Sequence, residues 1–256
     1  MRYSTRVALM TIIRKEVRRF MRIWVQTLIP PAITMTLYFL IFGSLIGSRI
    51  GQMGGYDYMS FVIPGLIMMA VINNSYSNVA SSFYSAKYSK SIEELLVSPT
   101  PNYIIVLGWV TGGALRGLLV GLIVTLLSLF FTKLPLHSLV LTVGVVVLSA
   151  MLFALAGLIN AIFANSFDDI SVVPTFVLTP LTYLGGVFYT IDMLPSFWQW
   201  LSMFNPILYL VNLFRYGLLG VSDVSVAQSL FGVCVFLVLL ATAAVYLMEN
   251  SKRLRH

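Results

Sequence analysis

Charged residues are scarce in this sequence of 256 residues: they make up 10% of it, whereas apolar residues make up 59%. A soluble domain carries about 25% charged residues, so this chain has too few to cover a surface that faces water. Most of its surface must therefore face lipid. The apolar runs are continuous, without the alternating segments of about ten residues that transmembrane β-barrels show. The composition predicts an all-α integral membrane protein.

Residues that carry chemistry are also rare. The single cysteine, Cys234, lies in an apolar run, so no disulfide can form within the chain. His137 and His256 are isolated, and the sequence contains neither a His-Glu-x-x-His zinc motif nor a Gly-x-Ser-x-Gly elbow. No Gly-Lys pair occurs either, which excludes the P-loop that holds ATP phosphates. We therefore expect no metal, no bound cofactor and no enzymatic activity in this chain.

Six apolar runs are long enough for helices that cross a membrane, which need about 20 residues. They lie at 23–45, 59–81, 103–131, 139–164, 170–189 and 227–248. An even number of spans places both termini on the same side of the membrane. The sequence thus predicts six transmembrane helices.

The basic residues, which give a net charge of +7, flank these runs and do not suggest a nucleic-acid surface. One side would hold Arg2, Arg6, Arg14, Lys15, Arg18, Arg19, Arg22, Lys87, Lys90, Lys252, Arg253 and Arg255. The other side would hold only Arg49, Lys133 and Arg215. Because positive charge is enriched in cytoplasmic segments, we expect both termini to lie in the cytoplasm.

The segment 1–22 has the pattern of an amphipathic helix. Apolar residues recur at intervals of three and four: Val7, Met10, Ile13, Val17 and Phe20. Cations line another face: Arg14, Lys15, Arg18, Arg19 and Arg22. Such a helix lies on a membrane surface, with its apolar side in the lipid and its cations near anionic headgroups. It could serve only to set the topology, or it could also contact a partner.

The stretch SIEELLVSPTP, residues 91–101, predicts a short cytoplasmic helix over 91–98 between the second and third spans. Ser91 and Glu94 have the spacing of a capping box, and Glu93 and Glu94 would favour the positive end of the helix dipole. Pro99 and Pro101 would end the helix.

A helix this short is marginal in water, so its apolar face must pack on something. That face would consist of Ile92, Leu95 and Leu96. It could pack against its own protein or the lipid headgroups. Alternatively, Ile92 and Leu95 could anchor the helix in a groove of a partner protein.

The connection between the fifth and sixth spans is too apolar for a loop in water. Two helix starts can be recognised, at Leu194-Pro195 and at Asn205-Pro206, where Asn205 can cap free N–H groups and Pro206 loses no hydrogen bond. Each helix would have about 10 to 14 residues, too short to span. We expect an outer re-entrant helical hairpin over 195–218, which includes Arg215.

Several polar or small residues inside the spans could line a path or serve packing. Arg116 in the third span could face a cavity or extend to the inner interface. Asn73, Asn74 and Asn78 could line a hydrophilic entrance or join helices by hydrogen bonds. Gly113, Gly117 and Gly121, spaced by four, favour close helix packing.

Taken together, the basic N-terminal helix, the six spans, EELLVSPTP and FNPILYLVNLFRYG resemble the ABC-2 family over essentially the whole chain. This family comprises the membrane subunits of bacterial ATP-binding-cassette exporters. The resemblance implies a single ABC-2 transmembrane domain over 1–256, located in the bacterial inner membrane. It also implies that 91–98 is the coupling helix, 1–22 the connecting helix and 195–218 the external re-entrant helices.

The resemblance further implies a homodimer with two separate ATPase subunits, which bind the ATP and its magnesium and drive export. A stand-alone secondary transporter or channel is the alternative. It would need ionisable residues at mid-membrane, for which Arg116 is the one candidate. An intramembrane enzyme is disfavoured because no cluster of acids or histidines is visible.

Overall fold

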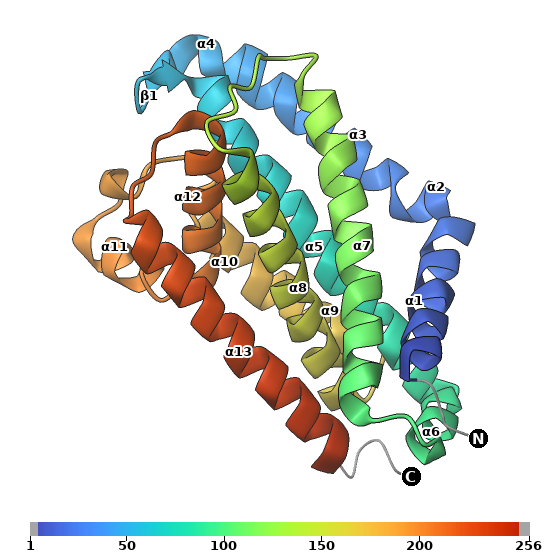
Figure 1. Ribbon diagram of the computed structural model, residues 1–256. Helices are drawn as coiled ribbons and strands as arrows, with labels where there is room; N and C mark the ends of the chain where they lie inside the picture. Colours follow the sequence, from blue (N-terminus) through green and yellow to red (C-terminus); the bar gives the residue numbers. More distant parts are fainter. Residues whose placement is uncertain (1–4, 251–256) are drawn as a thin grey trace.

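The computed structural model describes residues 5–250, and within that range the protein is built almost wholly of helices (Figure 1). Two short strands, β1 (Gln52–Met53) and β2 (Tyr56–Asp57), pair antiparallel, with Gln52 opposite Asp57. Gly54 and Gly55, with φ angles of 58° and 82°, make the turn between them, a conformation that suits glycine. The predicted all-α class is confirmed for this part of the chain.

Five helical segments among residues 5–250 are long and apolar enough to cross a membrane. They are Trp24–Ile50, α5 (Tyr58–Tyr88), α7 (Asn102–Ser128), α8 (Leu139–Phe163) and α13 (Val226–Asn250). The first consists of α2 (Trp24–Thr27), α3 (Ile29–Leu40), the π-helical η1 (Ile41–Ile46) and α4 (Gly47–Ile50). Each segment overlaps one of the predicted runs.

The remaining predicted run, 170–189, forms a shorter and irregular helical segment. It consists of α9 (Asp169–Val173), the π-helical η2 (Pro174–Leu178) and α10 (Thr179–Tyr183). Pro180 has no N–H to donate to the helix. The N–H of the residue before it, Thr179, bonds to the carbonyl oxygen of Pro174, five residues earlier, which is the wider π-helical pattern. At 1.5 Å per residue the segment is about 22 Å long, less than the hydrocarbon thickness of about 30 Å. A sixth span therefore stays a prediction.

The start of α9 is fixed by a capping box. The N–H of Asp169 donates to the Ser166 hydroxyl at 3.1 Å, and the N–H of Ser166 donates to the Asp169 carboxylate at 3.2 Å. The N–H of Asn165 donates to the same carboxylate at 2.8 Å, and this bond contributes most to lowering the pKa of Asp169. The Asp169 carboxylate therefore caps the start of α9.

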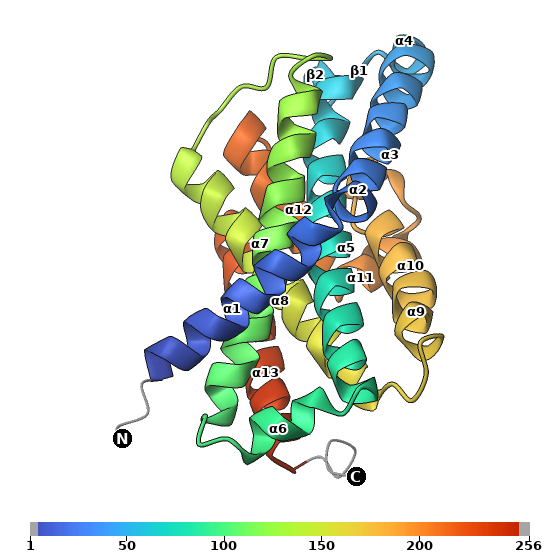
Figure 2. The same cartoon turned by 90° about the vertical axis from the view of Figure 1, so that its right-hand side faces the viewer.

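The helix α5 lies at the centre of the bundle, packed between α7 and α8 (Figures 1 and 2). Of its most apolar stretch, 89% is buried, against 12% for Trp24–Ile50 and 11% for α13. Gly157 of α8 sits directly against the carbonyl oxygen of Tyr76 in α5, where a side chain would collide with backbone. The core of the protein is therefore organised around α5.

The two ends of the bundle differ. At the lower end of Figure 1 lie α6 (Ser91–Val97), the end of α13 and the start of α1 (Thr5–Arg22). At the upper end lie α4 and β1. The 3₁₀ turn η3 (Ile191–Met193), α11 (Ser196–Ser202) and α12 (Pro206–Leu219) occupy the left side of that view. In Figure 2, α1 crosses the front of the bundle diagonally before the chain turns upward into α2 and α3.

Candidate functional site

The short helix α6 joins the ends of α5 and α7, but it does not begin with the predicted capping box. Lys90 is the residue before the helix and has a φ of 60°, in the left-handed region. This tight turn places Ser91 inside the helix, where its hydroxyl donates to the carbonyl oxygen of Ala86 at 3.3 Å. No side chain caps the helix start. The capping-box prediction for Ser91 and Glu94 is therefore wrong.

The helix α6 ends just before Pro99, as the sequence predicts. The helix stops at Val97, and Ser98, in the extended conformation, donates its hydroxyl to the carbonyl oxygen of Leu95 at 2.6 Å. Pro99 and Pro101 follow in non-helical backbone, as their missing N–H groups require.

The apolar face of α6 packs mainly against its own protein, one of the two alternatives that the sequence left open. Ile92 is only 1% exposed and packs in a cluster with residues of α5, α7 and α8, so it is not available as an anchor for a partner. Leu95 and Leu96 are half-buried against the same cluster. Glu94 is exposed and Val97 is 87% exposed. Because they are three residues apart, they share the outward face. Val97 was missed because the apolar face was assigned without knowing which side meets the bundle.

The helix α1 packs against α7 through a face that was not predicted. The buried positions, every fourth residue, are Ala8, Ile12, Glu16 and Phe20. Val7 and Met10 of the predicted stripe are exposed and so are free to face lipid as predicted, whereas Phe20 of that stripe is buried. The contact with α7 is close, because a methyl group on Gly108 would come within 2.6 Å of Ile12, and one on Gly112 within 2.5 Å of Glu16. The two glycines open a groove in which this face of α1 lies.

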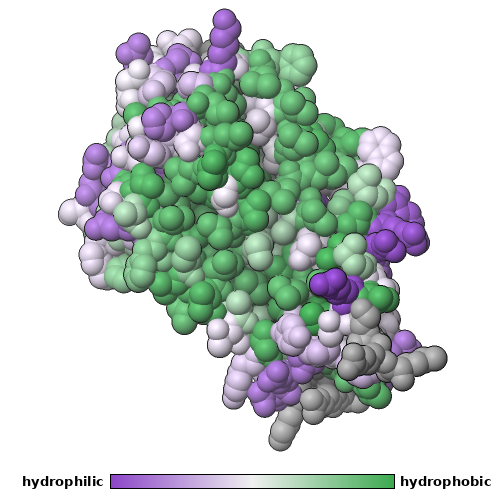
Figure 3. Space-filling model, viewed as in Figure 1, coloured by the Kyte–Doolittle hydropathy of each residue, from purple (hydrophilic) through white to green (hydrophobic). Residues whose placement is uncertain are grey.

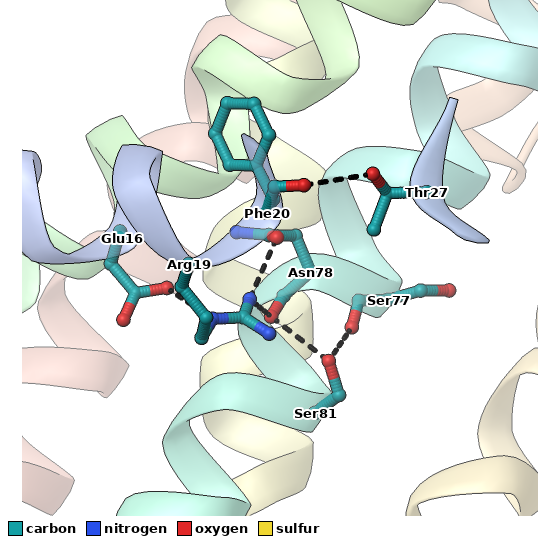
Figure 4. Close-up of polar contacts among 7 residues, drawn as sticks. All are labelled: Glu16, Arg19, Phe20, Thr27, Ser77, Asn78 and Ser81. Carbon is teal, nitrogen blue, oxygen red and sulfur yellow. Dashed lines mark hydrogen bonds and ion pairs between the residues drawn. The ribbon is translucent and has the colours of Figure 1, made fainter. Parts of the chain in front are cut away.

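A polar junction joins α1 to α5 (Figure 4). Glu16 is only 1% exposed, and its carboxylate lies 3.4 Å from the Arg19 Nε. The Arg19 Nη2 donates to the side-chain oxygen of Asn78 at 2.8 Å and to its backbone oxygen at 3.1 Å. Thr27, at the start of the first span, donates to the carbonyl oxygen of Phe20 at 3.0 Å. The buried carboxylate thus has a counter-charge, which is itself held by α5.

Arg116 extends this junction to α7. Its Nη2 donates to the Asn74 side-chain oxygen at 3.1 Å and to the carbonyl oxygen of Thr27 at 3.4 Å. Asn74 also donates to the carbonyl oxygen of Ala70, one turn earlier. Asn74 and Asn78 therefore hydrogen-bond across helices, whereas Asn73 is half-buried nearby. Arg116 thus connects α7 to α5 and to α2, the short helix with which the first span begins.

The glycines spaced by four in α7 contact α5. Side chains added at Gly113, Gly117 and Gly121 would collide with Val79, Ser75 and Val71, respectively. The Gly121 position is the least crowded, with a methyl group 2.6 Å from the Val71 Cγ2. These glycines let two long helices approach closely, so their geometry is that of packing.

Comparison with known proteins identifies the family. The sequence profile of the ABC-2 type transporter family matches residues 7–219. This chain belongs to the ABC-2 type transporter family. The resemblance seen in the sequence is thereby confirmed.

Several known relatives align with this ABC-2 chain. It is 58% identical to the "Inner membrane transport permease YadH" of Escherichia coli (strain K12), over 97% of both chains. The protein of the same name from Shigella flexneri shows the same identity and coverage. More distant is "Nodulation protein J" of Sinorhizobium fredii (strain NBRC 101917 / NGR234), 25% identical over 84% of this chain and 82% of the relative. Family and relatives support a transport permease subunit.

The helical hairpin of this ABC-2 permease begins as predicted. Asn205 accepts a hydrogen bond from the N–H of Ile207 at 3.0 Å, and Pro206 occupies the first helical position of α12. The Asn205 amide also donates to the carbonyl oxygen of Leu181 at 2.6 Å, which ties the hairpin to α10. The other helix, α11, has 7 residues and is shorter than expected.

Arg215 fastens α12 to the bundle. Its side chain is fully buried, with the guanidinium 3.9 Å from the centre of the Phe61 ring in α5. The Nη2 donates to the carbonyl oxygen of Gly186 at 2.6 Å, and the Nη1 lies 3.7 Å from the Asp223 carboxylate. Arg215, which the sequence predicts on the outer side, is thus buried and links α12 to three other segments of the permease.

A groove lined largely by hydroxyl groups has no signal in the sequence. It has a volume of about 350 Å³ and lies between α5 and the α9–η2 segment. Its polar lining consists of Tyr76, Ser77, Ser81, Ser171 and Thr175. Single serines and threonines in apolar runs give no distinctive pattern, so only the packing of the two segments brings them together.

Proposed function

We propose that this chain is the membrane subunit of an ATP-driven exporter in the bacterial inner membrane, powered by a separate ATPase subunit. ABC-2 family membership supports a transport permease, and the relatives named inner membrane permeases support the location. The sequence has no P-loop, so ATP and its magnesium would bind to the partner. Work must then reach the permease through a protein contact.

The observation that carries this proposal is the exposed face of α6. Val97 is 87% exposed at the tip of a helix whose other side is fixed to the bundle. Glu94 and Pro99 are exposed beside it. An apolar side chain with a neighbouring carboxylate, held on a short rigid helix, suits insertion into a groove of a partner. We assign Ser91 to Pro99 to the coupling role and α1, with Arg14, Lys15, Arg18 and Arg19, to the connecting role.

In this proposal the end that carries α6 is cytoplasmic, because basic residues are enriched in the segments predicted there. The α9–α10 segment would complete six spans, and the hairpin of α11 and α12, with Asn205, Pro206 and Arg215, would cap the outer side. Two copies would enclose the path, each with one ATPase subunit. ATP-driven closure of the ATPases would press on α6 and shift the permease between inward- and outward-facing states.

The experiment replaces Val97 by aspartate in the purified permease, reconstituted with its ATPase subunit. A charge forced into an apolar groove should lower binding of the ATPase, and its stimulated ATP hydrolysis, by at least about tenfold. Leu136→Asp is the matched control, since Leu136 is an exposed apolar residue in the connection between α7 and α8. Stimulation equal to the unaltered permease would contradict the docking role of α6.

The same reconstitution tests the alternative of a stand-alone transporter or channel. Arg116, the candidate for ion coupling, is hydrogen-bonded to Asn74 and to the backbone of Thr27. We expect no substrate movement in vesicles that contain this chain alone. Transport without any ATPase would refute the proposed function as a whole.

A further inference from the structure

The exposed side of α1 carries a groove whose lining includes the four cations to which the proposed function gives a connecting role. It has a volume of about 650 Å³ and is lined by Thr11, Arg14, Lys15, Arg18, Arg19, Arg22 and Ile23. We call it the basic groove. Arg14, Arg18 and Arg22 are spaced by four and therefore form a row along one face of the helix.

Among residues 5–250, three of the cations in the basic groove have neither an ion pair nor a ring contact. Arg19 is paired with Glu16, the one carboxylate of α1, and the Lys15 ammonium lies 5.7 Å from the centre of the Trp109 ring. Arg14, Arg18 and Arg22 form no ion pair with any residue from 5 to 250. Like charges at this spacing repel one another, so a bound anion would relieve the repulsion.

The surroundings of the groove indicate which anion fits. Ile23 forms part of its wall, and exposed Trp24 and Val25 follow directly and lead into the exposed first span. In Figure 3 the hydrophilic residues at the right-hand edge, where α1 lies in Figure 1, border directly on the hydrophobic surface. Tryptophan is typical of the boundary between headgroups and hydrocarbon. A ligand here meets cations and an apolar surface together.

We propose that the basic groove binds the phosphate of an anionic phospholipid, whose acyl chains lie along the exposed face of Trp24–Ile50. Phosphate oxygens accept charge-assisted hydrogen bonds from guanidinium groups, often two from one arginine. A lipid contacts both the cations of the groove and the apolar surface beside it, whereas a free anion contacts only the cations. Lipid binding at this site does not depend on the proposed ATPase partner. The proposal gives α1 a second role, which is to bind a lipid beside α2, where the first span begins.

The test measures lipid binding by the purified full-length chain in a neutral detergent. Dioctanoyl phosphatidylglycerol is titrated, and the midpoint of thermal unfolding reports binding. Dioctanoyl phosphatidylcholine and glycerol 3-phosphate serve as parallel probes. The variant R14Q/R18Q/R22Q removes the unpaired cations, R14K/R18K/R22K keeps their charge, and R49Q/K133Q removes cations that lie outside the groove.

We expect phosphatidylglycerol to raise the midpoint for the unaltered chain, the lysine variant and R49Q/K133Q. Its apparent affinity should fall at least tenfold in the glutamine variant, and phosphatidylcholine should have no such effect. Glycerol 3-phosphate acting as strongly as the lipid would make this a free-phosphate site and overturn the proposal. So would a glutamine variant that binds phosphatidylglycerol normally but no longer binds the ATPase, since the cations would then serve a protein contact. If the triple variant does not fold, R18Q alone must still weaken binding of phosphatidylglycerol.

Discussion

Replacing Arg19 by leucine should destabilise the permease, because it removes the counter-charge of a carboxylate that water does not reach. Glu16 is 1% exposed and lies 3.4 Å from the Arg19 Nε. Arg19→Leu also leaves the side-chain oxygen of Asn78 without its donor at 2.8 Å. The variant therefore strands one charge and one polar group between α1, α5 and α7.

The magnitude follows from the burial of the two partners. Removing one member of a buried ion pair costs about 3–5 kcal/mol. The Arg19 side chain is 32% exposed, so water screens part of the interaction and the loss should fall at or below the lower end of this range, at about 2–3 kcal/mol. For a chain of this size about 1 kcal/mol corresponds to roughly 2–4 °C, so the unfolding midpoint in neutral detergent should fall by about 5–10 °C.

A neighbouring cation provides the matched control. Arg18 lies one position away on the same helix, is exposed, and has no ion-pair partner among residues 5–250. Arg18→Leu should shift the midpoint by less than about 2 °C. Adding Glu16→Gln to Arg19→Leu removes the stranded charge and should recover more than half of the loss. If Arg19→Leu and Arg18→Leu behave alike, or if the double variant recovers nothing, the junction does not stabilise the fold as argued.

The remaining predictions concern packing and capping. Gly112→Val should displace α1, since even a methyl group there would lie 2.5 Å from the Glu16 Cβ, and should cost about 1–3 kcal/mol. Gly144→Val, where an added Cβ meets nothing within 4 Å, is the control, and equal thermal shifts for the two would contradict the docking of α1 on α7. Asn205→Ala removes both the cap of α12 and the bond to Leu181 and should cost about 2 kcal/mol. Asn205→Ser keeps a capping oxygen and should lose only about half as much stability. Comparing the unfolding midpoints of the two variants checks this prediction.

Features that depend on lipid or on local backbone chemistry could be predicted from the sequence. The helix α8 runs from Leu139 to Phe163, close to the predicted run of 139–164, because the apolar residues extend over that length and Ser138 caps its start. The start of α12 at Asn205-Pro206 follows from a side-chain acceptor next to a residue without an N–H. Neither inference required knowledge of another helix.

Features decided by a second segment could not be predicted. The buried face of α1 is set by contact with Gly108 and Gly112 of α7, which lie far along the chain from Ile12 and Glu16. Ser91 has the spacing of a capping box, yet the left-handed Lys90 turns it away, whereas the same chemistry forms at Ser166 and Asp169. Both places have a serine followed three residues later by an acidic residue. The backbone conformation of the residue before the serine decides whether the capping box forms.

The way in which α1 is held bears on how force from α6 could travel. The helix α6 connects the end of α5 to the start of α7, and close packing at Gly113, Gly117 and Gly121 joins these two helices near their middle. The helix α1 is fixed to α7 at Gly112 and to α5 through Arg19 and Asn78, so it must follow them. The first span is less constrained, because the chain breaks at Ile23 and again at Leu28, between α1, α2 and α3. In the proposed function, a push on α6 would therefore move α5, α7 and α1 as one unit, and the first span would adjust at these two breaks, beside the basic groove.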